Sequence, residues 1–129
     1  MTRTAVIAGV GPGLGESLAR KFATEGCRVA LFARSRDYIE DLADDLPDSG
    51  EGLAVQTDLT DVEQIRDGFE AVRDEFGPVD VLVNHASAAS WKGLMDVSVE
   101  EFEQAWAVNG RGAFVCSQEA VGDMLETGG

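Results

Sequence analysis

Apolar residues along the chain form short, nearly continuous runs, separated by longer segments in which they recur at helical spacing. Four runs predict β-strands: Thr4–Ala8 and residues 29–33, 53–56 and 79–83. Between them, apolar residues return every three or four positions, which is typical of helices that bury one face. These stripes comprise Leu14, Leu18, Ala19, Phe22 and Ala23; Tyr38, Ile39, Leu42, Ala43 and Leu46; and Val62, Ile65, Phe69, Val72 and Phe76.

Polar residues indicate where two of the helices begin. Thr60 with Glu63, and Ser98 with Glu101, have the spacing of a capping box, in which a hydroxyl and a carboxylate exchange hydrogen bonds with backbone amides of the first turn. The second box opens a long helical region that we expect to continue towards Leu125.

The alternation of apolar strands with helices of ten or more residues indicates the fold class. Strands that are apolar on both faces must be covered on both faces, as in a parallel sheet with right-handed helical crossovers. The sequence therefore predicts an α/β fold with a doubly wound parallel sheet. No internal linker interrupts the 129 residues, and 44% of them are hydrophobic, so we expect a single domain over residues 1–129.

The formal net charge of −14 argues against binding to nucleic acid or to anionic membranes, because such a surface repels phosphate. Many carboxylates accompany two lysines, a composition that resembles halophilic proteins and is equally compatible with ordinary solubility. No apolar run reaches the roughly 18 residues of a membrane span, and no signal peptide precedes the first strand. We therefore expect a cytoplasmic protein.

The cysteines and tryptophans carry no recognisable chemistry. Cys27 and Cys116 lie far apart and lack metal-ligand neighbours, so we expect neither a disulfide nor a metal site. Both are interpreted as small apolar residues that are buried or half-buried. Trp91 and Trp106 are interpreted as core or interface aromatics, and residues 114–116 as a patch that packs on the sheet.

A glycine cluster follows the first strand, where a helix begins. Gly9, Gly13 and Gly15 have the spacing G-x-x-x-G-x-G, whereas G-x-G-x-x-G fails because Leu14 occupies its third glycine position. The free amides and the dipole of a helix N-terminus attract phosphate, so the loop predicts a cradle for a dinucleotide pyrophosphate. Gly9 would permit the tight exit from the strand, Gly13 the approach of the phosphates, and Gly15 close packing of the helix. A flexible turn without a ligand is the alternative.

Arg34 and Ser35 end the second predicted strand, where an NAD site would place an acid on the ribose hydroxyls. The Arg34 guanidinium can bind a 2′-phosphate through two hydrogen bonds, and Ser35 can add a further donor. The pair therefore favours NADP(H) over NAD(H), and it disfavours S-adenosylmethionine, which also presents ribose hydroxyls. The alternative is that Arg34 is solvated and Ser35 caps the next helix.

Four features in order make the chain resemble the short-chain dehydrogenase/reductase family over essentially its whole length. They are the glycine motif, with Ala8 where the family usually has Thr; the pair Asp58-Leu59; residues 84–87, Asn-His-Ala-Ser where the family has Asn-Asn-Ala-Gly; and Asn109. The resemblance implies a Rossmann-like sheet in the order 3-2-1-4. It also implies an oxidoreductase that transfers hydride between a nicotinamide and a small carbonyl or alcohol substrate.

The resemblance assigns a role to each matched residue. Asp58 and the Leu59 amide would contact the adenine, although Asp58 could be a plain turn residue. His85 would act through its backbone rather than as a general base. Asn109 would be the catalytic Asn that holds a water of the proton relay at a break in the long helix, or else an ordinary helix-interrupting residue. The expected cofactor-binding residues are Gly9, Gly13, Leu14, Gly15, Arg34, Ser35, Asp58, Leu59, Asn84, His85 and Ala86.

The remaining residues of the family's proton relay have no counterpart. The family uses a Tyr whose pKa is lowered by a Lys four residues later, and a Ser that orients the substrate oxygen. Here the only tyrosine is Tyr38, the lysines are Lys21 and Lys92, and no Tyr-x-x-x-Lys occurs. We therefore expect residues 1–129 to be inactive by themselves, as a cofactor-binding portion truncated before the catalytic Ser and Tyr-x-x-x-Lys.

Three hypotheses follow. The first is a truncated NADP-dependent oxidoreductase, the second a non-catalytic dinucleotide-binding or sensing module, and the third a subunit that is completed by a partner. Truncation is favoured because a four-stranded piece would leave its fourth strand as an unpaired edge and its last helix half uncovered. Since the family uses the long helix in subunit contacts, we expect a homo-oligomer.

Overall fold

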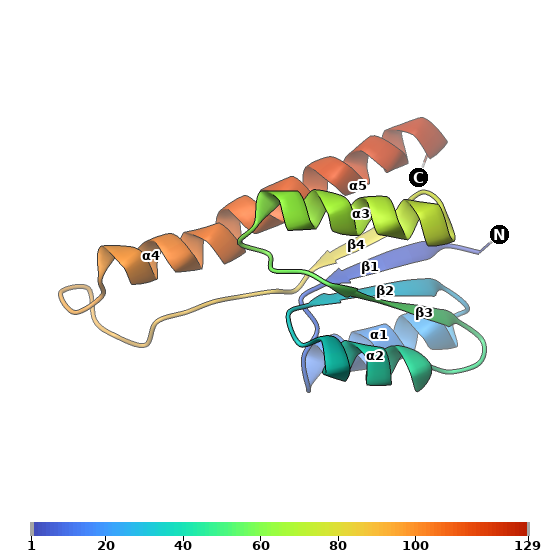
Figure 1. The fold of residues 1–129 in the computed structure, drawn as a ribbon, viewed down its shortest axis with the longest axis horizontal. Helices are drawn as coiled ribbons and strands as arrows, with labels where there is room; N and C mark the ends of the chain where they lie inside the picture. Colours follow the sequence, from blue (N-terminus) through green and yellow to red (C-terminus); the bar gives the residue numbers. More distant parts are fainter. Residues whose placement is uncertain (1, 129) are drawn as a thin grey trace.

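The computed structural model describes residues 2–128 and contains a parallel four-stranded sheet in the order β3-β2-β1-β4. Helices cover both faces of this sheet (Figure 1). The predicted fold class and strand order are therefore confirmed. The strands are β1 (Thr4–Ala8), β2 (Arg28–Ala33), β3 (Glu51–Gln56) and β4 (Val81–Asn84).

The helices divide into two layers. In Figure 1, α1 (Leu14–Thr24) and α2 (Arg36–Asp44) lie on one face of the sheet, and α3 (Val62–Phe76) and α5 (Ala113–Thr127) lie on the other. A further helix, α4 (Val99–Trp106), leads into α5 through a π-helical segment, η1 (Ala107–Gly112).

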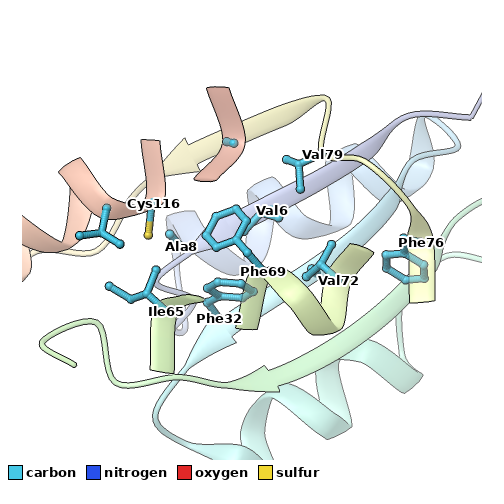
Figure 2. Close-up of a cluster of buried hydrophobic side chains, with 12 residues drawn as sticks. Val6, Ala8, Phe32, Ile65, Phe69, Val72, Phe76, Val79 and Cys116 are labelled. Atoms are coloured by element: carbon cyan, nitrogen blue, oxygen red, sulfur yellow. The ribbon is translucent and has the colours of Figure 1, made fainter. Parts of the chain in front are cut away.

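Alternate residues of β1 contribute to two hydrophobic cores. Val6 packs with residues of α3 and α5, whereas Ile7 packs with residues of α1 and α2. Figure 2 shows the first core, in which the rings of Phe32 and Phe69 meet edge to face with centroids 5.2 Å apart. A strand covered on both faces needs an apolar residue at every position, which explains the continuous apolar runs in the sequence.

Helix α3 is joined to α5 by a partly buried ionic contact. Arg73 Nε donates to Asp123 Oδ1 at 2.9 Å, and Arg73 Nη1 donates to Glu119 Oε1 at 3.2 Å. Asp123 is 9% exposed, and its Oδ2 accepts from the Val79 amide at 2.9 Å. The carboxylate of Asp123 thus fixes α5 to both α3 and the segment before β4.

One of the two predicted capping boxes is confirmed and one is wrong. The Ser98 hydroxyl accepts from the Glu101 amide, and the Glu101 carboxylate accepts from the Ser98 amide. At α3 the cap is Asp61 rather than Thr60, because the Asp61 carboxylate accepts from the first-turn amides. The hydroxyl and the amide of Thr60 both donate to Asp58 Oδ1 instead.

The edge strand β4 is followed by a loop and a long helical region that carry exposed apolar residues. Within residues 2–128, β4 pairs with β1 alone, and Trp91 and Trp106 are 97% and 59% exposed, so neither is a core residue. Phe114 is also exposed, whereas the two residues after it pack in the core, so the predicted patch is only partly correct. The other exposed apolar residues of this helical region are Val99, Phe102, Val121 and Leu125. Both cysteines are buried, as predicted.

Within residues 2–128, none of the helices is long and apolar enough to cross a membrane. The same residues contain no group of three or more His, Cys, Asp or Glu side chains that is placed to hold a metal ion.

Candidate functional site

A pocket of about 720 Å³ lies at the carboxyl ends of the strands. Parallel register brings these ends to one edge, since Ala8 pairs with both Phe32 and Asn84, and Ala33 pairs with Gln56. Its lining comes from all four loops that follow the strands, together with Tyr38 of α2, Gln104 of α4 and Val108 of η1. The predicted site residues in this lining are Gly9, Arg34, Ser35, Asp58, Leu59, His85 and Ala86.

The other predicted residues lie beside this pocket. Asn84 and Asn109 line a smaller pocket of about 170 Å³, which shares Leu59, Ala86 and Val108 with the larger one. Gly13, Leu14 and Gly15 form the start of α1 and belong to neither lining.

Gly9, Gly13 and Gly15 each meet a different steric demand. Gly9 has a φ of 97°, and a Cβ there would lie 2.5 Å from Ala86 Cα. Gly13 precedes α1 with a φ of 112°, and a Cβ on Gly15 would lie 3.1 Å from the His85 ring. The loop can therefore lie directly against the segment that follows β4, which a side chain at Gly9 would prevent.

The start of α1 presents unbonded donors. Gly13 occupies the N-cap position and provides no side chain to cap the helix. Within residues 2–128, the amides of Gly13, Leu14 and Gly15 have no hydrogen-bond acceptor. These amides and the helix dipole make this turn suited to binding an anion.

Arg34 and Ser35 lie at the mouth of the pocket, both exposed. The Gln56 side-chain amide donates to the Arg34 carbonyl at 3.1 Å, which fixes the backbone here. Arg34 belongs to none of the ion pairs in the described part of the chain. Ser35 occupies the N-cap position of α2, but its hydroxyl makes no capping hydrogen bond. Both side chains are therefore available to a ligand.

The loop after β3 is held by its own side chains. Asp58 Oδ1 accepts from the hydroxyl and the amide of Thr60 at 2.7 and 2.9 Å, and these bonds, the hydroxyl first, lower the pKa of Asp58. Gln64 Oε1 accepts from the Asp58 amide at 2.9 Å. The Leu59 amide has no acceptor within residues 2–128. A carboxylate oxygen and a free N–H thus lie at adjacent residues.

Asn109 connects η1 to the loop after β4. Its Oδ1 accepts from the Ala88 amide at 2.9 Å, and its Nδ2 donates to the Ala88 carbonyl at 2.6 Å. The amides of His85 and Ala86 both donate to the Ala8 carbonyl. A bend at Asn109 was expected, and the helix is in fact π-helical there, a distortion that is frequent at functional sites.

The same segment also holds the loop after β3, which the sequence did not indicate. Arg111 Nη2 donates to the Thr60 carbonyl at 2.7 Å. A Cβ on Gly112 would lie 2.6 Å from the Leu59 carbonyl oxygen, so the absence of a side chain permits this contact. Hence η1 is in contact with two of the four loops that form the pocket.

The sequence reading also missed Tyr38, which lines the pocket beside Arg34 and Ser35. Its hydroxyl donates to Glu16 Oε1 at 2.6 Å. Burial, and then this bond, raise the pKa of Tyr38 to about 12, whereas a proton-relay tyrosine needs a lowered pKa. Lys21 and Lys92 are paired with Glu25 and Glu101 instead. The described residues therefore do not form a Tyr-Lys relay.

Comparison with known proteins identifies the family. The model of the family described as short chain dehydrogenase matches residues 3–129. The chain belongs to the short-chain dehydrogenase/reductase family. It is 32% identical to an uncharacterized oxidoreductase, YxbG, from Bacillus subtilis, over 98% of this chain and 47% of that protein. It is also 32% identical to the 3-oxoacyl-[acyl-carrier-protein] reductase FabG of Staphylococcus aureus, over 97% of this chain and 52% of that protein.

Solved structures of the family agree in fold. An alcohol dehydrogenase from Thermococcus sibiricus, complexed with 5-hydroxy-NADP, has a TM-score of 0.94 and 33% identity, and the match covers 100% of this chain and 56% of that one. L-sorbose reductase from Gluconobacter frateurii, complexed with NADPH and L-sorbose, has a TM-score of 0.92 and 30% identity, covering 98% and 49%. A 3-ketoacyl-(acyl-carrier-protein) reductase from Brucella melitensis, complexed with NADH, has a TM-score of 0.90 and 31% identity, covering 98% and 51%. The chain thus spans about half the length of these relatives.

Proposed function

We propose that this chain binds NADP(H) in the pocket at the carboxyl edge and provides the cofactor site of an oxidoreductase that interconverts a carbonyl and an alcohol. The observation that carries the preference for NADP(H) is the pair Arg34 and Ser35 at the pocket mouth, where an NAD site would have an acid. Within residues 2–128, the Arg34 side chain forms no ion pair and the Ser35 hydroxyl forms no capping hydrogen bond. Family membership supports the oxidoreductase class, and solved relatives hold NADP-type or NADH cofactors.

The unbonded donors would serve the pyrophosphate and the adenosine half of a dinucleotide. The amides of Gly13, Leu14 and Gly15 would bind the pyrophosphate at the start of α1. The guanidinium of Arg34 would bind the 2′-phosphate, with Ser35 as an additional donor. An adenine has a ring nitrogen acceptor beside an amino donor, which complements the Leu59 amide and the free oxygen of Asp58. The same carboxylate also makes the loop turn, so the two roles proposed for Asp58 are compatible.

The nicotinamide end would lie against the segment after β4. Asn84, His85 and Ala86 would support the cofactor there, with His85 acting through its backbone. The bound nicotinamide supplies or accepts hydride. Asn109 would position the surrounding backbone through its paired hydrogen bonds to Ala88, and a water held beside it could take part in proton transfer.

The proton relay itself is assigned to residues outside this chain. No Tyr-x-x-x-Lys occurs in residues 1–129, and Tyr38 is bonded to Glu16. We therefore propose that residues 1–129 form one nucleotide-binding unit that is inactive alone, and that Ser, Tyr and Lys are provided by a further part of a longer protein. Cytoplasmic location, a small-molecule substrate and homo-oligomeric assembly belong to the same proposal, the last supported by exposed apolar residues on α4 and α5.

The first test is calorimetric titration of the protein with NADPH and with NADH, repeated on Arg34→Ala and Arg36→Ala. Arg36 is the matched control because it lies two residues away, outside the pocket lining, and its Nε donates to Glu40 Oε1. We expect NADPH to bind more tightly than NADH, and Arg34→Ala to weaken NADPH roughly 10- to 100-fold. That factor corresponds to a net loss of about 1.5–3 kcal/mol, the contribution of one charged hydrogen bond, as befits an exposed side chain. Equal affinity for both nucleotides, or equal loss in both variants, contradicts the assignment of Arg34.

A non-catalytic dinucleotide-binding module is the second candidate, favoured by the absence of the Tyr-Lys pair from this chain. A redox assay of the isolated chain with NADPH and carbonyl substrates addresses the relay. Turnover by this chain would show that the relay is complete and refute its assignment to further residues. Comparison of the intact mass of the protein in its native cells with that of residues 1–129 then separates a longer enzyme from a small module.

A further inference from the structure

Tyr38 joins the starts of the two helices that border the phosphate end of the pocket. It is the third residue of α2, it lines the pocket, and its side chain is half-buried. Its hydroxyl donates at 2.6 Å to Oε1 of Glu16, the third residue of α1. The glycine loop leads directly into α1, and Arg34 and Ser35 lead directly into α2. One hydrogen bond therefore connects the two segments that would hold the pyrophosphate and the 2′-phosphate.

The bond belongs to a network that attaches α2 to α1 at both ends. The other oxygen of Glu16 accepts from Arg20 Nε at 3.4 Å. Arg20 in turn donates through Nη2 to Asp45 Oδ2 at 3.0 Å and through Nη1 to the Asp45 carbonyl at 3.3 Å, just beyond the end of α2. The Tyr38 contact holds the first turn of α2, whereas the Arg20 contacts hold the last.

The protonation states favour this bond over the physiological pH range. Burial and the neighbouring Glu16 raise the pKa of Tyr38 to about 12, so the phenol keeps its proton. The hydrogen bond from Tyr38 lowers the pKa of Glu16, so the carboxylate stays ionised. A neutral donor thus faces a charged acceptor, which is a strong type of hydrogen bond.

We propose that Tyr38 is a positioning residue for cofactor specificity: by fixing the first turn of α2 to α1, it holds Arg34 and Ser35 at the place where the 2′-phosphate of NADP(H) arrives. The inference rests on the proposed function, because it concerns the same pocket. NADH lacks the 2′-phosphate, and its pyrophosphate and adenine would be bound by the glycine loop and by Asp58. Loss of the Tyr38 bond therefore weakens NADPH binding and leaves NADH binding nearly unchanged.

Two substitutions of Glu16 separate positioning from simple charge. Glu16→Gln keeps an oxygen that accepts from Tyr38, and it should retain the preference for NADPH. Glu16→Ala removes the acceptor and a negative charge together. A charge effect alone would then strengthen NADPH binding, because one carboxylate no longer repels the phosphates. Positioning predicts the opposite result, a loss of preference equal to that of Tyr38→Phe.

The experiment is titration of the protein and of Tyr38→Phe, Glu16→Ala and Glu16→Gln with NADPH and NADH. The control is Glu25→Gln, which removes the exposed ion pair with Lys21 on the same helix. We expect Tyr38→Phe and Glu16→Ala to lower the ratio of NADPH to NADH affinity about fivefold, equivalent to about 1 kcal/mol, with no change in Glu16→Gln or the control. An equal loss for both nucleotides, or tighter NADPH binding by Glu16→Ala, overturns the inference.

Hydrogen exchange at the Ile39 amide gives a readout without nucleotide. This buried residue donates to the Ser35 carbonyl at 3.2 Å in the first turn of α2, so its exchange reports opening of that turn. We expect roughly tenfold faster exchange in Tyr38→Phe, equivalent to about 1.4 kcal/mol, because losing one hydrogen bond to a charged group lowers the free energy of opening that turn. Unchanged exchange of the Ile39 amide in Tyr38→Phe would overturn the positioning role of Tyr38, while the proposed function would stand. If the unaltered protein binds neither nucleotide, the proposed function is overturned and the inference with it.

Discussion

Replacement of Gly112 by alanine should destabilise the protein, although helix propensity alone predicts the reverse. Gly112 has helical dihedral angles, φ −60° and ψ −48°, and Gly→Ala within a helix usually stabilises by roughly 0.8–1 kcal/mol. Here, however, the new Cβ would lie 2.6 Å from the Leu59 carbonyl oxygen and 3.0 Å from the Ala107 carbonyl oxygen. Both are backbone atoms, which cannot turn away as a flexible side chain could.

The magnitude follows from these two opposing effects. Overpacking a close contact typically costs about 1–3 kcal/mol, and subtracting the propensity gain leaves a net destabilisation of up to roughly 2 kcal/mol. For a chain of this size that corresponds to a lower Tm by up to roughly 10 °C. The new Cβ would also push the loop after β3 away from η1. Because Leu59 of this loop lines the larger pocket, the affinity for NADPH should decrease as well.

The matched control is Gly122→Ala in α5. Gly122 is exposed, and a Cβ there would meet no atom within 4 Å. This variant should be stabilised by roughly 0.5–1 kcal/mol, and its nucleotide affinity should be unchanged. Urea denaturation of both variants, with NADPH titration, compares them directly. Stabilisation of Gly112→Ala to the same degree as Gly122→Ala would refute the close contact on which this reasoning depends.

Three further predictions concern charge. Asp123→Ala should lower the free energy of unfolding by about 3–5 kcal/mol in urea melts. The substitution leaves the partly buried Arg73 without its main partner and the buried Val79 amide without an acceptor. A loss below about 1 kcal/mol would contradict this expectation. An NMR titration should place the pKa of Asp58 below its ordinary value, and this pKa should rise in Thr60→Val, which lacks the donating hydroxyl. The stability that these bonds contribute in the wild-type protein is therefore present above the ordinary pKa of an aspartate. It is lost as the pH falls through the lowered pKa. Finally, if the net charge of −14 is a halophilic adaptation, Tm should continue to rise with salt above about 1 M. Simple screening of charges is already nearly complete at that concentration. A plateau of Tm below about 1 M would instead favour ordinary solubility as the role of the charge.

Most of the fold could be predicted because the information is local. Continuous apolar runs followed by helical stripes are visible in any short window, and they determine which elements form and that the sheet is parallel. The start of α3 was misplaced because Thr60 and Asp61 can both cap a helix. The choice between them depends on Asp58, whose carboxylate takes both donors of Thr60. For the tryptophans the sequence left core and interface positions open, because hydrophobicity alone does not show what covers a side chain; their exposure excludes the core.

In the candidate site, too, the residues in local turns were predicted and those that depend on tertiary contacts were not. The glycine loop, Arg34 and Ser35 were found by spacing, since each belongs to a turn between adjacent elements. Tyr38 was missed because its partner Glu16 lies 22 residues earlier, and no pattern of apolar residues reveals that contact. The bond from Arg111 to the Thr60 carbonyl spans 51 residues and depends equally on tertiary packing.

The π-helical segment also affects how the long helix can tolerate changes in length. A π-turn contains in effect one residue more than the α-helical turn it replaces, yet both complete a single turn. Deletion of one residue between Ala107 and Gly112 should therefore restore regular α-helix while leaving α4 in nearly the same rotation about the axis of α5. Phe102 and Trp106 would keep their direction, whereas the bonds from Asn109 to Ala88 and from Arg111 to Thr60 depend on the residues of the π-turn itself. The extra residue therefore serves the two loops at the pocket rather than the direction of the helix.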